Sequence, residues 1–162
     1  MFTETQRFDQ WWLRGLFVGI HGLFAFGTWQ RFGGNSSAPN DLPPTAVLVL
    51  WAVVALLTLL FFRTRLHTRV DASGVQARFA PWQQRGRHIP WEQVQGCRVR
   101  RYRPLVDLGG WGWRRSLNGR LEGYTTRGDQ ALELDLGDRR SLLIGTQRPE
   151  ELVAVLRVLG KG

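Results

Sequence analysis

A run of basic and aromatic side chains between positions 98 and 115 is the part of this chain best suited to bind another molecule. It consists of Arg98, Arg100, Arg101, Arg103, Trp111, Trp113, Arg114 and Arg115, and it ends in the segment GGWGWRR. Guanidinium groups bind phosphate and carboxylate in a bidentate manner, and tryptophan rings are well suited to the headgroup region of a membrane. These residues are candidates for contact with anionic lipid or with an acidic partner. The alternative stays open that the tryptophans are core residues and the arginines form a solvated face.

No pattern typical of catalysis or metal binding accompanies this run. His67 and His88 lack the spacing of metal ligands, and the serines lack a G-x-S-x-G context. The single cysteine, Cys97, excludes a disulfide within one chain and is expected to be a small core residue. The sequence therefore predicts no enzyme activity, no metal and no cofactor.

The positive charge of the chain lies in its second part. Residues 1–62 hold three arginines against three acidic residues, whereas residues 63–162 hold nineteen Lys or Arg against ten Asp or Glu. Eighteen of those nineteen are arginine. A basic domain beside a bilayer favours anionic headgroups of the cytoplasmic leaflet as a ligand, although an arginine-rich composition alone explains the same excess.

Two apolar segments precede this basic part. Residues 45–62 contain no charge, and at 1.5 Å per residue they reach about 27 Å, close to the hydrocarbon thickness of a bilayer. Residues 11–29 precede this segment in the chain and form a weaker predicted span. Membrane-interface residues are predicted at the ends of the two segments, namely Trp11, Trp12 and Trp29 for the first and Arg63, Arg65 and Arg69 for the second. Residues 1–62 are thus expected to be a membrane anchor, with residues 1–10 as a frayed or interfacial lead-in.

The loop between the two spans carries one Arg and one Asp, whereas three arginines follow the second span. The positive-inside rule therefore predicts a helical hairpin in the cytoplasmic (inner) membrane with both termini in the cytoplasm. A cleaved signal peptide is the alternative for the first span, because Ser36 and Ala38 have the spacing of a cleavage site.

Within the hairpin, two features of the first span indicate how it packs. Gly15, Gly19 and Gly22 are predicted to pack against the second span or a second copy of the chain. His21 lies in the middle of the span, where an ionisable residue is a functional candidate; it has no partner acid, so a neutral histidine hydrogen-bonded across the hairpin is favoured.

The remaining residues, 66–160, read as short strands closed by one helix. Apolar residues alternate with polar ones over 66–71, 75–79, 94–102 and 132–136, and residues 111–124 are expected to form a hairpin turning at Asn118-Gly119. Residues 149–159 follow the stripe of an amphipathic helix, with Thr146 placed to cap it. The predicted fold class is α+β: a transmembrane helical hairpin followed by a small antiparallel β-barrel or sandwich that the final helix closes.

The order of these pieces resembles bacterial pleckstrin-homology-like domains, in particular an uncharacterised family with two N-terminal transmembrane helices. The matching segments are IPW at 89–91, YRPL at 102–105, GGWG at 109–112, and IGT at 144–146 leading into RPEEL at 148–152. The resemblance implies a non-catalytic domain at the membrane and carries no established ligand.

Three kinds of partner remain for such a domain. We expect a protein partner, a scaffold within a membrane complex or a homo-oligomer first, because two helices already fix the domain to the membrane. Anionic headgroups are the alternative. Nucleic acid would contact the same residue types, but no recognised nucleic-acid motif is present, so we do not expect it.

Overall fold

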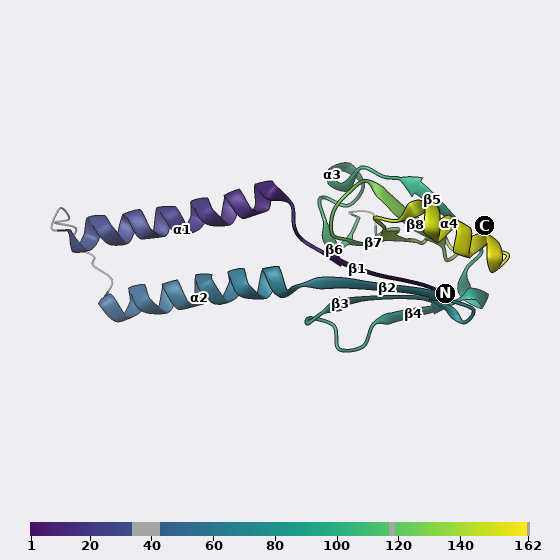
Figure 1. Cartoon of the computed structure of the whole chain (residues 1–162), viewed down its shortest axis with the longest axis horizontal. Coiled ribbons are helices and arrows are strands. Elements are labelled where there is room, and N and C mark those ends of the chain that lie inside the picture. Colours follow the sequence, from purple (N-terminus) through teal and green to yellow (C-terminus); the bar gives the residue numbers. More distant parts are fainter. Residues whose placement is uncertain (34–42, 117–118, 162) are drawn as a thin grey trace. The chain divides into compact units, whose positions relative to one another are not determined.

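A computed structural model describes residues 1–33, 43–116 and 119–161, and the chain divides into two compact units (Figure 1). One unit, termed the β domain, joins Met1–Phe8 to Thr64–Gly162. The other, termed the helical unit, is Asp9–Arg63. The residues Ser36, Ala38 and Asn118 singled out above lie outside the described residues.

The helical unit consists of α1 (Trp11–Phe32) and α2 (Pro44–Arg63) (Figure 1). Among the described residues, only α2 is both long and apolar enough to cross a membrane, with a mean hydropathy of 2.7 over its best window. The weaker predicted span lies in α1, a helix of 22 residues. Its hydropathy does not reach the level required of a span, because glycines and polar residues interrupt the apolar sequence.

Polar side chains inside the helical unit are paired across the two helices. His21 Nε2 lies 3.1 Å from Thr58 Oγ1, and the His21 ring stacks on Trp51 at 5.8 Å between centroids. Trp51 in turn donates from Nε1 to Thr28 Oγ1 at 3.1 Å. The contact predicted for His21 across the hairpin is therefore present.

The glycines of α1 do not make the contact expected of them. A Cβ built on Gly15, Gly19 or Gly22 would meet no atom within 4 Å apart from the helix itself. Their face is turned away from α2, which is contacted instead by larger side chains such as Phe17, whose ring lies 5.1 Å from that of Phe61. The prediction that these glycines pack against the second span was wrong, and the alternative, packing against a second copy of the chain, stays a prediction.

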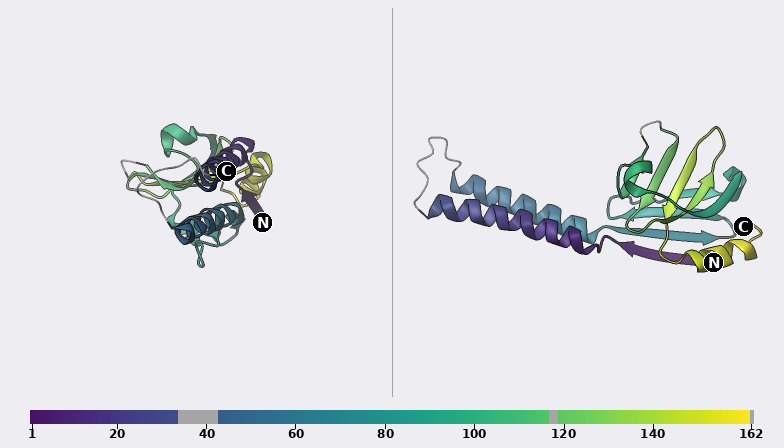
Figure 2. Two further views of the ribbon diagram at one scale, coloured as in Figure 1. Left: turned by 90° about the vertical axis from the view of Figure 1, so that its left-hand side faces the viewer. Right: turned by 90° about the horizontal axis from the view of Figure 1, so that it is seen from above.

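The β domain holds two sheets whose strands run in clearly different directions (Figure 2). The first sheet is antiparallel in the order β1-β2-β3-β4 and contains β1 (Phe2–Arg7), β2 (Arg65–Asp71), β3 (Gly74–Ala80) and β4 (Arg87–Pro90). A short 3-10 turn, η1 (Trp91–Gln93), leads out of it.

The second sheet has the order β5-β8-β9-β7-β6. Its strands are β5 (Gly96–Arg101), β6 (Gly112–Arg115), β7 (Leu121–Thr125), β8 (Gln130–Asp135) and β9 (Ser141–Gly145), with the helical turn α3 (Pro104–Asp107) between β5 and β6. The hairpin of β6 and β7 forms as predicted. The expected all-antiparallel pairing was wrong, because β7 pairs with β9 in parallel. Of the two predicted alternatives, barrel and sandwich, the sheets do not form a closed barrel.

The core lies between the two sheets and under α4 (Pro149–Val158). Inward residues of the alternating strands fill it, among them Leu66, Phe79 and Leu132. From α4, Leu152 and Leu156 are buried while Val155 and Leu159 pack at the edge. The amphipathic stripe predicted for the C-terminal helix is thus confirmed.

The first residues of the chain are a strand of the β domain and not a frayed lead-in. In β1, Phe2, Glu4 and Gln6 are buried, and the strand pairs with β2 from Phe2 opposite Val70 to Arg7 opposite Arg65. The earlier interpretation failed because two of the three inward side chains are polar, so no apolar alternation marks the strand.

Distant backbone and hydroxyl groups satisfy those two buried polar side chains. Glu4 accepts hydrogen bonds from Thr146 Oγ1 and from the Gln147 backbone N–H, each at 2.8 Å. Gln6 donates to the Gly145 carbonyl at 2.6 Å and accepts from Thr126 Oγ1 at 2.7 Å. Thr146 Oγ1 also accepts a hydrogen bond from the Arg148 backbone N–H at 3.1 Å, so Thr146 links β1 to the start of α4. The N-cap residue of the helix is Arg148, which makes no capping side-chain bond, and not Thr146 as predicted.

Candidate functional site

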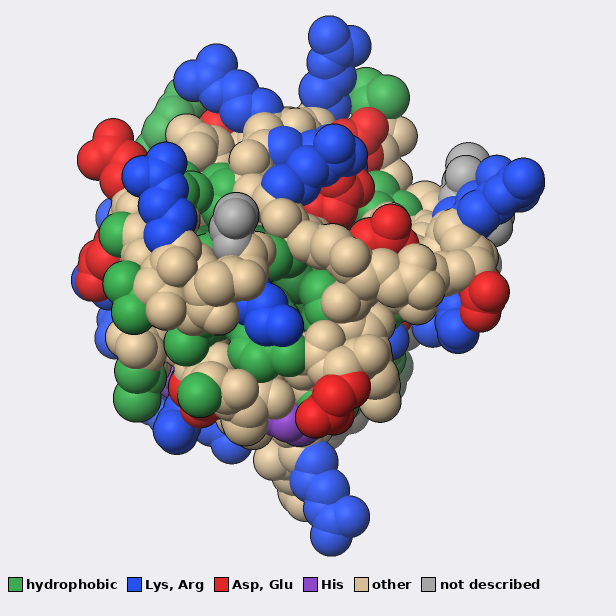
Figure 3. Space-filling model, turned by 90° about the vertical axis from the view of Figure 1, so that its right-hand side faces the viewer, with side chains coloured by type: hydrophobic (Ala, Val, Ile, Leu, Met, Phe, Trp, Pro, Cys, Tyr) green, Lys and Arg blue, Asp and Glu red, His purple; other side chains and the backbone are tan. Residues whose placement is uncertain are grey.

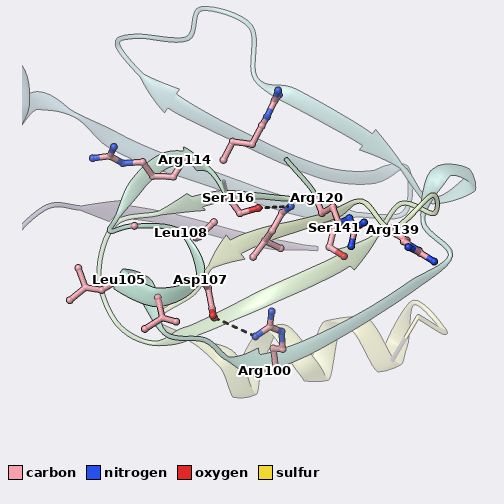
Figure 4. A pocket seen from close by; sticks show the side chains of 13 residues that line it. Arg100, Leu105, Asp107, Leu108, Arg114, Ser116, Arg120, Arg139 and Ser141 are labelled. Carbon is pink, nitrogen blue, oxygen red and sulfur yellow. Dashed lines mark hydrogen bonds and ion pairs between the residues drawn. The ribbon is translucent and has the colours of Figure 1, made fainter. Parts of the chain in front are cut away.

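A hollow of about 770 Å³ opens on the β domain, and we term it the basic hollow (Figure 4). Its border carries five arginines, which are Arg100, Arg114, Arg115, Arg120 and Arg139. The other side chains that the argument uses are Asp107, Ser116, Ser141, Leu105, Val106 and Leu108. Five guanidinium groups and one carboxylate lie on this border, so positive side chains predominate there.

Four separate segments bring the arginines together. Arg100 comes from β5, Arg114 and Arg115 from β6, Arg120 from the residue before β7, and Arg139 from the turn between β8 and β9. The parallel pairing of β7 with β9 places the starts of these two strands side by side, and Ser141 N–H donates to the Arg120 carbonyl at 2.8 Å. Sheet topology, more than closeness in sequence, builds the basic hollow.

Arg100 is held in place by acidic neighbours. Its Nε and Nη2 donate to the two oxygens of Glu133 at 2.9 and 3.1 Å, and its Nη1 lies 3.9 Å from Asp107 Oδ2. Burial by itself would raise the pKa of Glu133, but hydrogen bonds from Arg100 and Arg98 outweigh it and lower that pKa below its ordinary value. Arg100 is thus fixed in orientation and carries little uncompensated charge.

Arg115 shares its acidic neighbour with other groups. Its Nη2 lies 3.9 Å from Glu122 Oε2, while Glu122 also accepts hydrogen bonds from Arg87 and, at 2.8 Å, from Trp113 Nε1. Burial opposes ionisation of Glu122, but the bonds from Trp113 and Arg87 prevail and lower its pKa. Because Arg87 belongs to β4, this carboxylate also links the two sheets.

Arg114 and Arg139 carry the charge that other residues leave uncompensated. Both side chains are exposed, and within residues 1–33, 43–116 and 119–161 neither forms an ion pair with an acidic residue. Arg114 Nε reaches only the Trp111 carbonyl, at 3.4 Å. Such guanidinium groups are able to take up an external anion without first releasing an internal one.

An apolar border adjoins the arginines. Leu105 and Val106 of α3 are 70% and 75% exposed, and Trp113 of β6 is 59% exposed. Leu108 anchors α3 to the sheet so closely that a Cβ on Gly123 would lie 2.3 Å from Leu108 Cδ1, which explains the glycine at this position of β7. A fixed turn therefore presents two large aliphatic side chains to solvent next to the basic hollow.

Of the eight residues predicted from sequence, the basic hollow gathers Arg100, Arg114 and Arg115. Arg101 and Arg103 border a separate shallow depression with Asp129, and Arg98 borders another beside Cys97. Trp111 lies at the surface near the Gly128 carbonyl, to which its Nε1 donates at 3.2 Å.

The interpretation of both tryptophans as core residues was wrong for Trp113, because more than half of its side chain is exposed. Arg120 and Arg139 were missed. Each follows a turn signal in the sequence, Asn118-Gly119 and Gly137-Asp138, but only the strand order shows that Arg120 and Arg139 border the same hollow.

The predicted membrane-interface residues are distributed over both units. Trp11 and Trp29 are exposed near the two ends of α1, and Trp12 is exposed beside Trp11. Arg63 ends α2, whereas Arg65 and Arg69 belong to β2, with Arg69 Nε bonded to Asp71 Oδ2 at 2.9 Å.

Trp82 was not predicted and lies close to this connection. It is 60% exposed, and its Nε1 donates to Thr64 Oγ1 at 2.7 Å. Thr64 is the first residue after α2, so this tryptophan marks the end of the β domain at which the chain passes into the helical unit.

Charge elsewhere on the β domain is mixed. The face drawn in Figure 3 shows Lys and Arg side chains interspersed with Asp and Glu. Among the described residues, no three or more His, Cys, Asp or Glu side chains are grouped so that they could hold a metal ion. Burial raises the pKa of the Cys97 thiol, so this cysteine is a weak nucleophile at neutral pH.

Comparison with known proteins identifies the family of the domain and gives no activity or ligand. A family model described as a bacterial PH domain matches residues 65–160. The search of curated proteins found no match, and neither did the search of solved structures. The matched range begins at β2, so β1 and the helical unit are additional to the family model.

Proposed function

We propose that this chain, which belongs to the bacterial PH domain family, is a non-catalytic interaction module that binds the anionic surface of the membrane to which it is anchored. The observation that carries this proposal is the position of the exposed pair Leu105 and Val106 beside the basic hollow. Aliphatic side chains next to uncompensated arginines suit a bilayer interface, where apolar groups enter the acyl boundary and cations meet headgroup phosphates.

The pairing of β1 with β2 supports a two-span anchor. Arg7 lies opposite Arg65 within one folded domain, so both residues are on the same side of any membrane. A chain that leaves that side must return to it, and the number of crossings between these residues is therefore even. If α2 crosses, a second crossing falls within residues 8–43, where α1 provides 22 helical residues, or about 33 Å.

Cysteine accessibility tests this topology on the full chain. In a Cys97→Ser background, we expect Thr45→Cys, at the start of α2, to react with a membrane-impermeant maleimide from outside intact cells. Thr3→Cys in β1 and Gln76→Cys in β3 are expected to react only after permeabilisation, because the arginines after α2 keep the β domain in the cytoplasm. Labelling of Thr45→Cys and Thr3→Cys from the same side would contradict two spans.

Arg114→Ala combined with Arg115→Ala is expected to weaken docking of the β domain onto anionic lipid by about 30-fold, at roughly 1 kcal/mol for each arginine near the surface. The readout is hydrogen exchange of residues 104–116 with the full chain in nanodiscs of phosphatidylcholine, with or without phosphatidylglycerol. The unaltered chain should exchange more slowly in the anionic discs, and added salt should remove the difference.

The matched control is Arg78→Ala with Arg157→Ala, which removes the same charge from exposed positions on β3 and α4. This pair is expected to leave the slow exchange of residues 104–116 intact. Equal exchange in neutral and anionic discs for the unaltered chain would argue against lipid docking.

A protein partner is the second candidate, and the sheet edges favour it. Within the part of the chain that the structure describes, strands β4, β5 and β6 each pair with one neighbour only, so each leaves an edge that an extended segment of another chain could join. Cross-linking of the full chain in its native membrane distinguishes the two candidates, because an edge-bound partner would cross-link to β4 or β5 irrespective of lipid charge.

A further inference from the structure

We infer that the basic hollow is a binding site for a phosphomonoester, carried on a lipid with a small headgroup. This inference rests on the proposed function and deepens it, because it replaces a general attraction to negative charge with recognition of one phosphate type. Three features of the hollow carry it: its polarity, the number of its donors and the backbone of one turn.

The two ends of the basic hollow differ in chemistry. Arg120, Arg139 and Ser141 gather at one end, while Leu105 and Leu108 lie at the other together with Arg114 (Figure 4). An amphiphile fits this arrangement when its phosphate lies at the arginine end and its glycerol and first methylenes lie along the leucines. The volume of about 770 Å³ falls within the usual range of small-molecule sites and exceeds the need of a bare ion.

The donors at the arginine end match a terminal phosphate better than a bridging one. A phosphomonoester offers three terminal oxygens and a charge of about −1.5 to −2 near neutral pH. A diester such as phosphatidylglycerol offers two free oxygens and a single charge. Arg120 and Arg139 are able to bind different edges of the same phosphate, with the Ser141 hydroxyl as a further donor.

The turn that presents Arg139 has an unfavourable backbone. Asp138 and Arg139 have φ values of 50° and 58°, in the left-handed region, and the turn closes through hydrogen bonds from Arg140 N–H to the Gly137 carbonyl and from Leu136 N–H to the Arg140 carbonyl. Two-residue hairpin turns of this kind favour Asn or Gly. Arg139 therefore occupies a backbone conformation that disfavours it, and within residues 1–33, 43–116 and 119–161 its side chain makes no hydrogen bond or ion pair that accounts for an arginine there.

Native mass spectrometry of the full chain in a neutral detergent tests the inference. The probes are phosphatidic acid, phosphatidylglycerol and phosphatidylcholine with identical acyl chains, together with glycerol 3-phosphate as a soluble phosphomonoester. We expect one phosphatidic acid to bind with a Kd at least about tenfold below that of phosphatidylglycerol. Glycerol 3-phosphate binding as tightly as phosphatidic acid would assign the site to a soluble phosphomonoester, and weaker binding assigns it to the lipid.

Two variants locate the site. Arg120→Gln and Arg139→Gly are each expected to raise the Kd for phosphatidic acid about tenfold while leaving phosphatidylglycerol nearly unchanged. Glycine suits the positive φ of position 139, so the Arg139→Gly chain should resist thermal unfolding at least as well as the unaltered chain, which excludes loss of fold as the cause. Arg157→Gln on α4 is the control of equal charge.

The possible failures are distinct. Equal affinity for phosphatidic acid and phosphatidylglycerol, both above phosphatidylcholine, would overturn the phosphomonoester inference and leave the proposed function standing. No preference for either anionic lipid over phosphatidylcholine would overturn both. Selectivity for phosphatidic acid that persists in Arg120→Gln and Arg139→Gly would place the phosphate elsewhere and overturn the assignment to the basic hollow.

Discussion

Replacing Phe2 and Glu4 together by alanine is expected to lower the free energy of unfolding of the β domain by about 6 kcal/mol. Phe2 is 1% exposed, and truncation of a buried phenylalanine typically costs about 3–5 kcal/mol. Removal of the Glu4 carboxylate leaves Thr146 Oγ1–H and Gln147 N–H without their acceptor, at about 1–3 kcal/mol for each group that stays buried. Such a loss equals much of the stability of a typical domain.

The measurement is urea-dependent hydrogen exchange of β3 and β9 in the full chain, because α1 and α2 are not expected to unfold with the β domain. Thr3→Ala with Thr5→Ala is the matched control, since both residues lie on the exposed face of the same strand. This control removes the exposed hydrogen bond between Thr5 Oγ1 and His67 Nδ1 and lowers strand propensity, and it should cost about 1 kcal/mol. Equal effects of the two double variants would mean that β1 does not belong to the core.

The contacts behind this effect explain why most strands could be predicted from the sequence but β1 could not. In β2 and β3, the inward positions are apolar with one polar exception, so a period of two is visible. In β1, burial of Glu4 and Gln6 is possible only because groups more than a hundred residues away accept or donate their hydrogen bonds. No local pattern contains that information.

Some residues of the candidate site could likewise be predicted from the sequence, and others could not. The arginines of β5 and β6 stand out as a cluster in the sequence, and the structure separates them: Arg98 and Arg100 share one side of β5 and both bind Glu133. Arg120 and Arg139 lie in separate turn segments and come to border the same hollow only through the parallel pairing of β7 with β9. An expectation of an all-antiparallel sheet could not have placed them together.

For the predicted membrane anchor, the fold adds information to an argument from composition. Hydropathy identifies α2 and leaves α1 below the level required of a span. The register of β1 with β2 bears on the same question through connectivity, because both ends of the helical unit must return to one domain. A Cβ at Gly15, Gly19 or Gly22 of α1 would meet no atom of α2 within 4 Å, so the spacing of these glycines does not indicate how α1 packs against α2.

Leu105→Asp combined with Val106→Asp is expected to weaken docking onto anionic nanodiscs by about 100-fold or more, the largest effect on binding that we predict. Burial of these two side chains in an interface contributes about 1.5–3 kcal/mol each, and each new carboxylate is repelled by the anionic surface. Because both side chains are exposed in the folded domain, the two substitutions should not disturb its packing. Slower hydrogen exchange of residues 104–116 in phosphatidylglycerol discs is the signal that should disappear.

Two further variants separate insertion from charge. Leu105→Asn with Val106→Asn removes the apolar surface without adding charge. We expect it to weaken docking by about 100-fold, and less than the aspartate pair does, because the lost transfer free energy remains while the repulsion does not. Val158→Asp, at an 88% exposed position on α4, adds a charge far along the chain from α3 and should leave docking unchanged. If the asparagine pair docks as well as the unaltered chain, the exposed aliphatic pair does not enter the bilayer, and attraction by the arginines alone must hold the domain.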